Sequence, residues 1–157
     1  ATERERLLDA GAKIAFCPSS NLFLGSGLLD IQAIPKNNLS IASDVGGGTR
    51  ISMLHTCVEG YKVAQAQGQQ FHPLEAFYAI TAGNAATLGL EDELGQLKPG
   101  YTADLVVVNP AKPNPLAERL ETCNDLTEEL FALMMLSDDR SIRRCYISGK
   151  LAYEGTC

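Results

Sequence analysis

The sequence predicts an α/β fold on three observations. Helical patterns alternate with short apolar runs up to about residue 90, which is typical of parallel strands covered by helices. Residues 91–157 instead read as apolar strands separated by turns. Only two strands fall within residues 1–90, and two parallel strands cannot form a sheet covered on both faces. We therefore expect the remaining strands of the first unit to lie outside this chain, on its N-terminal side.

The first unit is predicted to open with a helix and a strand. Residues 4–10 have a charged helical pattern that ends at Gly11, a residue suited to a helix C-terminus. Residues 13–17 form an apolar strand that Pro18 stops. The polar stretch at residues 19–27 contains two glycines, so we expect a loop there.

A second strand and more helices follow. We expect a short helix within residues 28–36, interrupted near Pro35, and then a strand at residues 39–42. Ile51, Leu54, Val58 and Tyr61 recur at helical spacing and predict an amphipathic helix to about residue 68. Two further helices are expected, one starting at Pro73 and one at residues 85–88.

The second unit, residues 91–157, is predicted to be a small sheet with a helix. Residues 103–108 form a strongly apolar strand that ends at Asn109 and Pro110. A helix is expected after Asp125, which can cap its first turn. Residues 142–147 and 151–153 flank Ser148-Gly149-Lys150 and predict a β-hairpin.

Composition excludes several classes of protein. The net charge is −6, and the chain has no basic stripe that could neutralise a phosphate backbone, so nucleic acid is not an expected partner. No apolar run reaches the roughly 18 residues of a membrane-spanning helix, and the charged N-terminus is unlike a signal peptide, so we expect a cytoplasmic protein. The five cysteines contain no CxxC pair and indicate reduced thiols. They are Cys17, Cys57, Cys123, Cys145 and Cys157.

The segment most suggestive of chemistry is SIASDVGGGTRISML, residues 40–54. Asp44 follows a predicted strand, where α/β barrels place catalytic groups, and such a carboxylate can bind a metal and exchange a proton. The glycines after it allow a sharp turn and close approach of a ligand. Two alternatives remain open: an Asp-containing turn that caps the next helix, and, less well matched to known motifs, a phosphate-binding loop.

Other candidate groups do not form a recognised constellation. The chain has two histidines, of which we expect His55 to be half-buried and structural and His72 to be exposed at a helix start. Ser20 and Asn21 follow the first strand and are predicted substrate contacts. No nucleophile motif surrounds Cys17 or the serines, so we interpret them first as loop structure.

Three segments resemble enzymes of the amidohydrolase superfamily. Residues 81–110, TAGNAATLGLEDELGQLKPGYTADLVVVNP, are similar to the signature that joins the last barrel helix to a small composite β-domain in that superfamily. Residues 142–155 resemble its final hairpin, and residues 10–27, AGAKIAFCPSSNLFLGSG, its seventh barrel strand and loop. Within the superfamily, ASDVGGGTRISML at residues 42–54 is most similar to guanine deaminases.

This resemblance implies a fold and a reaction. Residues 1–90 would be the last part of a (β/α)8 TIM-type barrel, with its seventh and eighth strands, and residues 91–157 part of the composite β-domain with one or two helices. Asp44 matches the aspartate that such enzymes place on a single zinc ion, where it would also accept a proton from the attacking water. The implied reaction converts guanine and water to xanthine and ammonia.

The resemblance also implies what this chain lacks. The superfamily's histidine ligands and its acid glutamate have no counterpart here, so we expect the chain to be a C-terminal fragment that is inactive alone. The resemblance further implies a homodimer. Two alternatives stay open: another purine or triazine deaminase or a chlorohydrolase of the same superfamily, and a non-catalytic binding or oligomerisation module.

Overall fold

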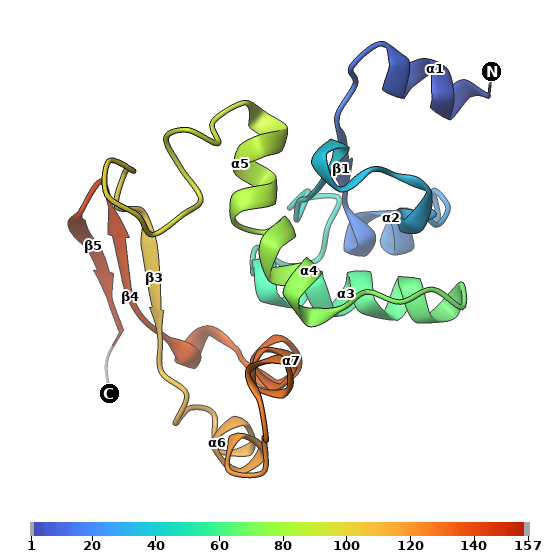
Figure 1. The fold of residues 1–157 in the computed structure, drawn as a ribbon. Coiled ribbons are helices and arrows are strands. Elements are labelled where there is room, and N and C mark those ends of the chain that lie inside the picture. The colour runs from blue at the N-terminus through green and yellow to red at the C-terminus, as the bar shows by residue number, and fades with distance from the viewer. Residues whose placement is uncertain (1, 156–157) are drawn as a thin grey trace.

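The computed structural model describes residues 2–155 and joins two parallel strands and a three-stranded sheet through helices (Figure 1). The α-helices are α1 Glu3–Asp9, α2 Pro18–Leu24, α3 Met53–Ala66, α4 Pro73–Ala79, α5 Ala82–Leu88, α6 Asn114–Leu120 and α7 Leu126–Leu136. Single 3-10 turns are η1 Ile31–Ala33, η2 Lys36–Asn38 and η3 Asp139–Ser141. The strands are β1 Ile14–Phe16, β2 Leu39–Ile41, β3 Leu105–Val108, β4 Ile142–Ile147 and β5 Lys150–Glu154. The predicted α/β character is therefore confirmed.

Strands β1 and β2 pair in parallel, as the alternation of helices and strands predicted. Their register aligns Ile14 with Leu39 and Phe16 with Ile41. The Ser40 hydroxyl donates to the Ile14 carbonyl at 3.2 Å, which adds a side-chain bond to this short pairing. Both strands therefore end at the same edge, and the segments that follow them lie close together.

On the side of β2 away from β1, a side chain bonds the backbone of one residue. Asn84 on α5 accepts from the Ile41 amide at 3.0 Å and donates to the Ile41 carbonyl, also at 3.0 Å. Ile41 is only 1% exposed, so these backbone groups need such a partner. The Asn84 side-chain amide thus replaces a neighbouring peptide group three residues before Asp44.

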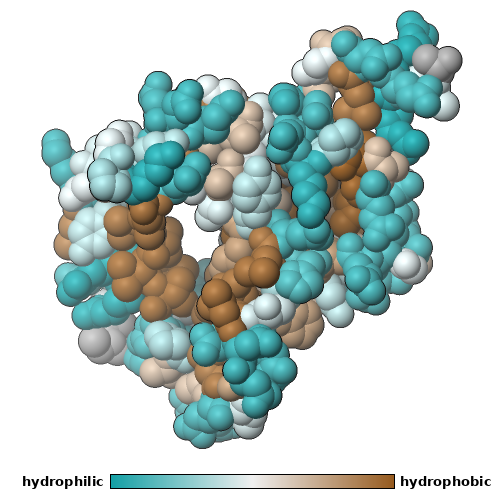
Figure 2. Space-filling model, in the orientation of Figure 1, coloured by the Kyte–Doolittle hydropathy of each residue, from teal (hydrophilic) through white to brown (hydrophobic). Residues whose placement is uncertain are grey.

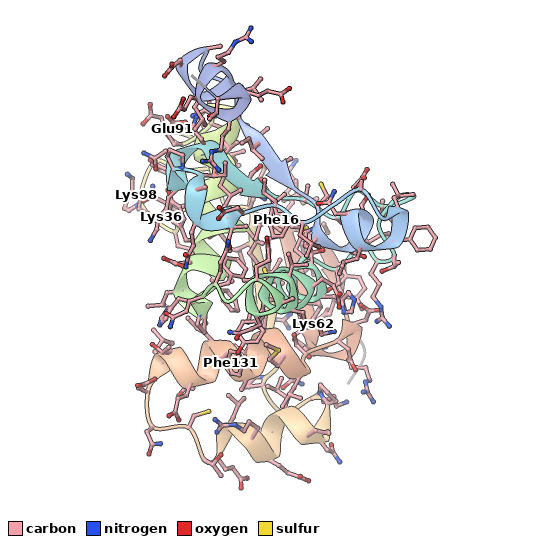
Figure 3. All side chains as sticks on the ribbon, turned by 90° about the vertical axis from the view of Figure 1, so that its right-hand side faces the viewer. Phe16, Lys36, Lys62, Glu91, Lys98 and Phe131 are labelled. Carbon is pink, nitrogen blue, oxygen red and sulfur yellow. The ribbon has the colours of Figure 1, made fainter. Side chains whose placement is uncertain are left out.

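The main hydrophobic core lies between the two short strands and helices α3, α4 and α7. Phe16, Ile41 and Cys57 are each about 1% exposed within it. Helix α7, on which Figure 3 labels Phe131, comes from the second half of the chain and packs on α3 and α4. The Phe131 ring meets the Tyr61 ring of α3 edge-on, with the ring centroids 5.4 Å apart. The core therefore includes residues from both predicted units.

Strands β3, β4 and β5 form an antiparallel sheet, and the predicted β-hairpin is confirmed. Ser148 and Gly149 form its turn with φ values of 50° and 74°, as a tight hairpin turn requires. The Asp104 carboxylate accepts from the Ser148 amide at 2.7 Å. Figure 2 shows hydrophobic surface on this sheet and on the helices, on either side of a hollow.

One local prediction was wrong. Residues 19–27 were expected to be a loop, but Pro18–Leu24 form α2. Pro18, interpreted as the end of a strand, is the first residue of that helix, where its missing N–H costs nothing, and Gly25 ends the helix at φ 66°. The short helix expected within residues 28–36 is present as a single 3-10 turn, η1, and Pro35 separates it from η2 as expected.

The remaining elements agree with expectation to within a few residues, except for one missed helix. Helix α6, Asn114–Leu120, begins directly after Pro113 in a segment to which no element had been assigned. Among the described residues, every helix is too short or too polar to cross a bilayer. Cys157 lies outside the described residues.

Candidate functional site

Asp44 lies just beyond the end of β2, beside the segment that follows β1. Its backbone adopts φ 47°, in the left-handed region that aspartate tolerates better than most residues. Its Oδ2 accepts a hydrogen bond of 2.7 Å from the Ser20 hydroxyl on the first turn of α2. The structure therefore brings together two of the three residues predicted for the site.

The glycine triplet after Asp44 forms a closed turn. The Gly47 and Gly48 amides both donate to the Asp44 carbonyl, and the Gly46 amide donates to the Gly48 carbonyl. A β-carbon on Gly48 would lie 1.8 Å from the Ser43 carbonyl oxygen, so only glycine fits there. Since all three glycine amides donate within the chain, they do not form a phosphate-binding loop.

The first turn of α2 holds both ends of this glycine turn. Ser20 bonds the Asp44 side chain at one end, and the Ser19 hydroxyl lies 2.7 Å from the Thr49 hydroxyl at the other. The Thr49 amide also donates to the Ser19 hydroxyl at 3.1 Å. Both serines are buried. Thr49 was missed by sequence reasoning, because a contact across 30 residues leaves no signal in local spacing.

Asn21 and Cys17 flank the serines and have different environments. The Asn21 side-chain amide donates to the Ser26 hydroxyl at 3.1 Å, on the exposed side of α2. Burial, and then the nearby Asp44 carboxylate, raise the pKa of the Cys17 thiol. A raised thiol pKa keeps Cys17 protonated at neutral pH, so it is a poor nucleophile and a poor metal ligand.

The two histidines occupy the places predicted for them. His55 is half-buried on α3, with its Nε2 3.7 Å from the Glu59 carboxylate. Burial, then Arg50, lower the pKa of His55. The exposed His72 caps α4, its Nδ1 accepting from the Leu74 amide at 3.3 Å.

A separate hollow of about 480 Å³ lies near the start of β2 and is lined by residues of η1, η2 and α4. Lys36 and Glu75 form an ion pair at its wall. Asp44 is not among its lining residues, so this hollow is distinct from the candidate site.

A zinc ion fits Asp44 as one ligand but not as a complete site. Its Oδ2 is bonded to Ser20, whereas its Oδ1 has no hydrogen-bond partner among residues 2–155, so one carboxylate oxygen is available. A catalytic zinc takes about three protein ligands. Within that same range no three His, Cys, Asp or Glu side chains lie close enough to hold a metal.

Comparison with known proteins identifies the family. The family model described as "Amidohydrolase family" matches residues 1–152. The guanine deaminase of Escherichia coli is 44% identical over 155 residues, which cover 97% of this chain and 35% of that protein. The guanine deaminase of Mus musculus is 32% identical over 153 residues, covering 90% of this chain and 34% of that protein.

Solved structures of deaminases are also similar to this chain. The E. coli guanine deaminase superimposes with a TM-score of 0.92 at 43% identity, covering 98% of this chain and 37% of that one. An adenosine deaminase from Xanthomonas campestris with bound zinc gives a TM-score of 0.78 at 26% identity, covering 96% and 34%. The chain thus spans about a third of the length of these relatives. Since the family model matches nearly all of its residues, the chain belongs to the amidohydrolase family.

Proposed function

We propose that this chain forms the C-terminal part of a zinc-dependent guanine deaminase, which converts guanine and water to xanthine and ammonia. The observation that carries the proposal is the Asp44 carboxylate beyond the end of β2, with one oxygen held by Ser20 and the other available. The similarity to guanine deaminases from two organisms supports the choice of substrate.

In this proposal β1 and β2 are the seventh and eighth strands of a (β/α)8 barrel, with residues 1–90 in the barrel and residues 91–157 in a composite β-domain. Parallel pairing and a carboxylate at the C-terminal edge of the strands support that assignment. The other zinc ligands and the acid glutamate would come from the N-terminal barrel portion. We also propose a homodimer and a cytoplasmic location, on the resemblance and the composition respectively.

Asp44 has two roles in the proposed reaction. When bound, zinc would lower the pKa of a coordinated water to about 7 and so would supply a nucleophile at neutral pH. Asp44 would contribute one ligand oxygen and would accept the proton of the attacking water, which it would pass toward the departing ammonia. Ser20 and Asn21 stay proposed contacts of the substrate, Ser20 through its remaining acceptor capacity.

A substrate comparison on the full product of the gene that encodes this chain tests the proposal. Guanine, adenosine and S-adenosylhomocysteine are supplied separately, and ammonia and the purine product are measured. We expect ammonia and xanthine from guanine, at a far higher kcat/KM than from the other two. Preference for another compound would assign a different deaminase of the family. Absence of ammonia with all three would contradict the proposal.

A further inference from the structure

Ser20 has a geometry that suits a second task besides substrate contact. Its side chain is 3% exposed, and its single hydroxyl proton is used in the 2.7 Å bond to Asp44 Oδ2. A buried hydroxyl that donates to a carboxylate fixes both the rotation of the carboxylate and the identity of its free oxygen. Ser20 can therefore act on the chemistry through Asp44.

We propose that Ser20 is the positioning residue of Asp44: it holds Oδ2 and so presents Oδ1 to the metal. This inference rests on the proposed function, in which Asp44 is a metal ligand. Groups that hydrogen-bond a metal ligand orient it and tune its affinity for the metal. The Ser20 hydroxyl supplies such a bond from within the same chain, across 24 residues.

The Asp44 backbone alone does not determine the direction of the carboxylate. The Gly47 and Gly48 amides bond the Asp44 carbonyl and fix the main chain at φ 47°. Rotation about the side-chain bonds remains, and the hydroxyl of Ser20 restricts it. Ser19 bonds Thr49 rather than Asp44. Ser20 therefore holds the Asp44 side chain, and Ser19 holds the far end of the glycine turn.

Gly47 gives independent support for a tightly fitted bond. A β-carbon at this position would lie 2.9 Å from the Ser20 hydroxyl oxygen and 3.0 Å from Asp44 Oδ2. Both distances are shorter than ordinary van der Waals contact, so any side chain there would displace one of the two bonded atoms. A β-carbon at residue 47 would therefore crowd this hydrogen bond.

The test compares Ser20→Ala with a matched control in the full gene product. Ser40→Ala also removes a buried hydroxyl, 9% exposed, but one that bonds the Ile14 carbonyl instead of Asp44. Zinc affinity is measured by competition with a chelator, and kcat and KM for guanine are measured separately. We expect Ser20→Ala to lower zinc affinity and kcat by about 10-fold or more, whether or not KM also changes. Ser40→Ala should retain the zinc affinity and the kcat of the wild type.

Two further variants separate positioning from bulk stability. Ser20→Thr keeps the hydroxyl and should restore most of the zinc affinity lost in Ser20→Ala. Gly47→Ala leaves the hydroxyl in place but crowds the bond, and should lower zinc affinity in the same direction. Hydrogen exchange of the peptide spanning residues 43–50 should rise in Ser20→Ala even without substrate.

The outcomes distinguish this inference from the function on which it rests. If the wild type deaminates guanine and Ser20→Ala raises KM alone, Ser20 contacts the substrate and the positioning role is wrong. The role is also wrong if Ser20→Ala and Ser40→Ala retain zinc equally. If the wild type binds zinc but does not deaminate guanine, while Ser20→Ala loses the metal, the proposed substrate fails and the positioning role stands. A wild type that binds no zinc overturns both.

Discussion

The strands of the two sheets in this molecule are stabilised to different degrees by backbone and side-chain hydrogen bonds. In the C-terminal sheet, strands of four to six residues pair through their backbones, and a two-residue turn joins β4 to β5. In the N-terminal pair, β1 and β2 have three residues each and depend on side chains, including those of Ser40 and Asn84. Asn38 adds another such bond, donating to the Ala12 carbonyl at 3.0 Å.

This difference shows where single substitutions should affect function. Backbone pairing in the C-terminal sheet does not depend on the identity of any one side chain. Around β1 and β2, individual polar side chains complete the strands, and Ser20 on the neighbouring helix α2 bonds Asp44. We therefore expect changes at the side chains that bond Asp44 to alter both stability and chemistry, and changes in the C-terminal sheet to alter stability alone.

The largest expected effect comes from a pair of aspartates, one in each region. Asp44→Asn in the full gene product removes the proposed ligand charge and proton acceptor, and should lower guanine-dependent ammonia release by about 10³-fold. Asp104→Asn is the control, because Asp104 only accepts from the Ser148 amide at the hairpin turn. Initial rates of ammonia release measure both. Equal losses in the two variants would erase the proposed distinction between the regions.

Two asparagine substitutions compare the loss of buried side-chain bonds to a strand with the loss of an exposed bond. Asn84→Ala leaves the buried Ile41 amide and carbonyl without partners and should cost about 1–3 kcal/mol of unfolding free energy. Asn124→Ala loses an exposed bond to Glu128 and should cost less than about 0.5 kcal/mol. Urea unfolding of the full gene product measures both costs. Similar midpoints would show that Asn84 does not sustain the edge of β2.

A pair of glycines with positive φ separates stability from chemistry. Gly25 ends α2 at φ 66° and Gly149 forms the hairpin turn at φ 74°, and a β-carbon would meet no close contact at either. Replacing each with alanine should therefore cost a similar strain of about 1 kcal/mol. Only Gly25→Ala should also weaken zinc binding, because α2 carries Ser20. Thermal unfolding and zinc competition together check this. Loss of zinc in Gly149→Ala would contradict the expected difference between the two regions.

The smallest expected effect is a dependence on pH. The hydrogen bond from Lys36 lowers the pKa of Glu75 below its usual 4.5. A carboxyl whose pKa is lower in the folded state adds stability above its unfolded pKa and loses it as pH falls through the folded value. The Glu75 side chain is 40% exposed, so the contribution should stay below about 0.5 kcal/mol. Lys36→Ala should slightly reduce the loss of unfolding free energy as the pH falls below 4.5. An unchanged dependence of unfolding free energy on pH would show that the Lys36–Glu75 pair adds no stability.

Local patterns were sufficient to predict most of the fold. The helix around residues 53–66 and the hairpin at residues 142–154 depend on periodicity and turn residues that lie within the element itself. Helices α2 and α6 were missed because each begins at or beside a proline, which equally well ends a strand or a loop.

The site was predictable only in part. Asp44 could be located because a carboxylate and glycines follow an apolar strand within a few residues. The roles of Ser19, Thr49 and Asn84 could not be predicted, because they depend on contacts across 30 to 43 residues, between α2 and the turn after β2 and between α5 and β2. A short parallel pair requires such distant partners, whereas a hairpin does not.

The most direct test measures zinc content and guanine-dependent ammonia release in parallel, on residues 1–157 alone and on the full product of the gene that encodes them. We expect the full product to hold zinc and release ammonia, and residues 1–157 to do neither, because Asp44 is proposed to be one ligand of a site completed elsewhere. Zinc binding and ammonia release by residues 1–157 alone would contradict this expectation.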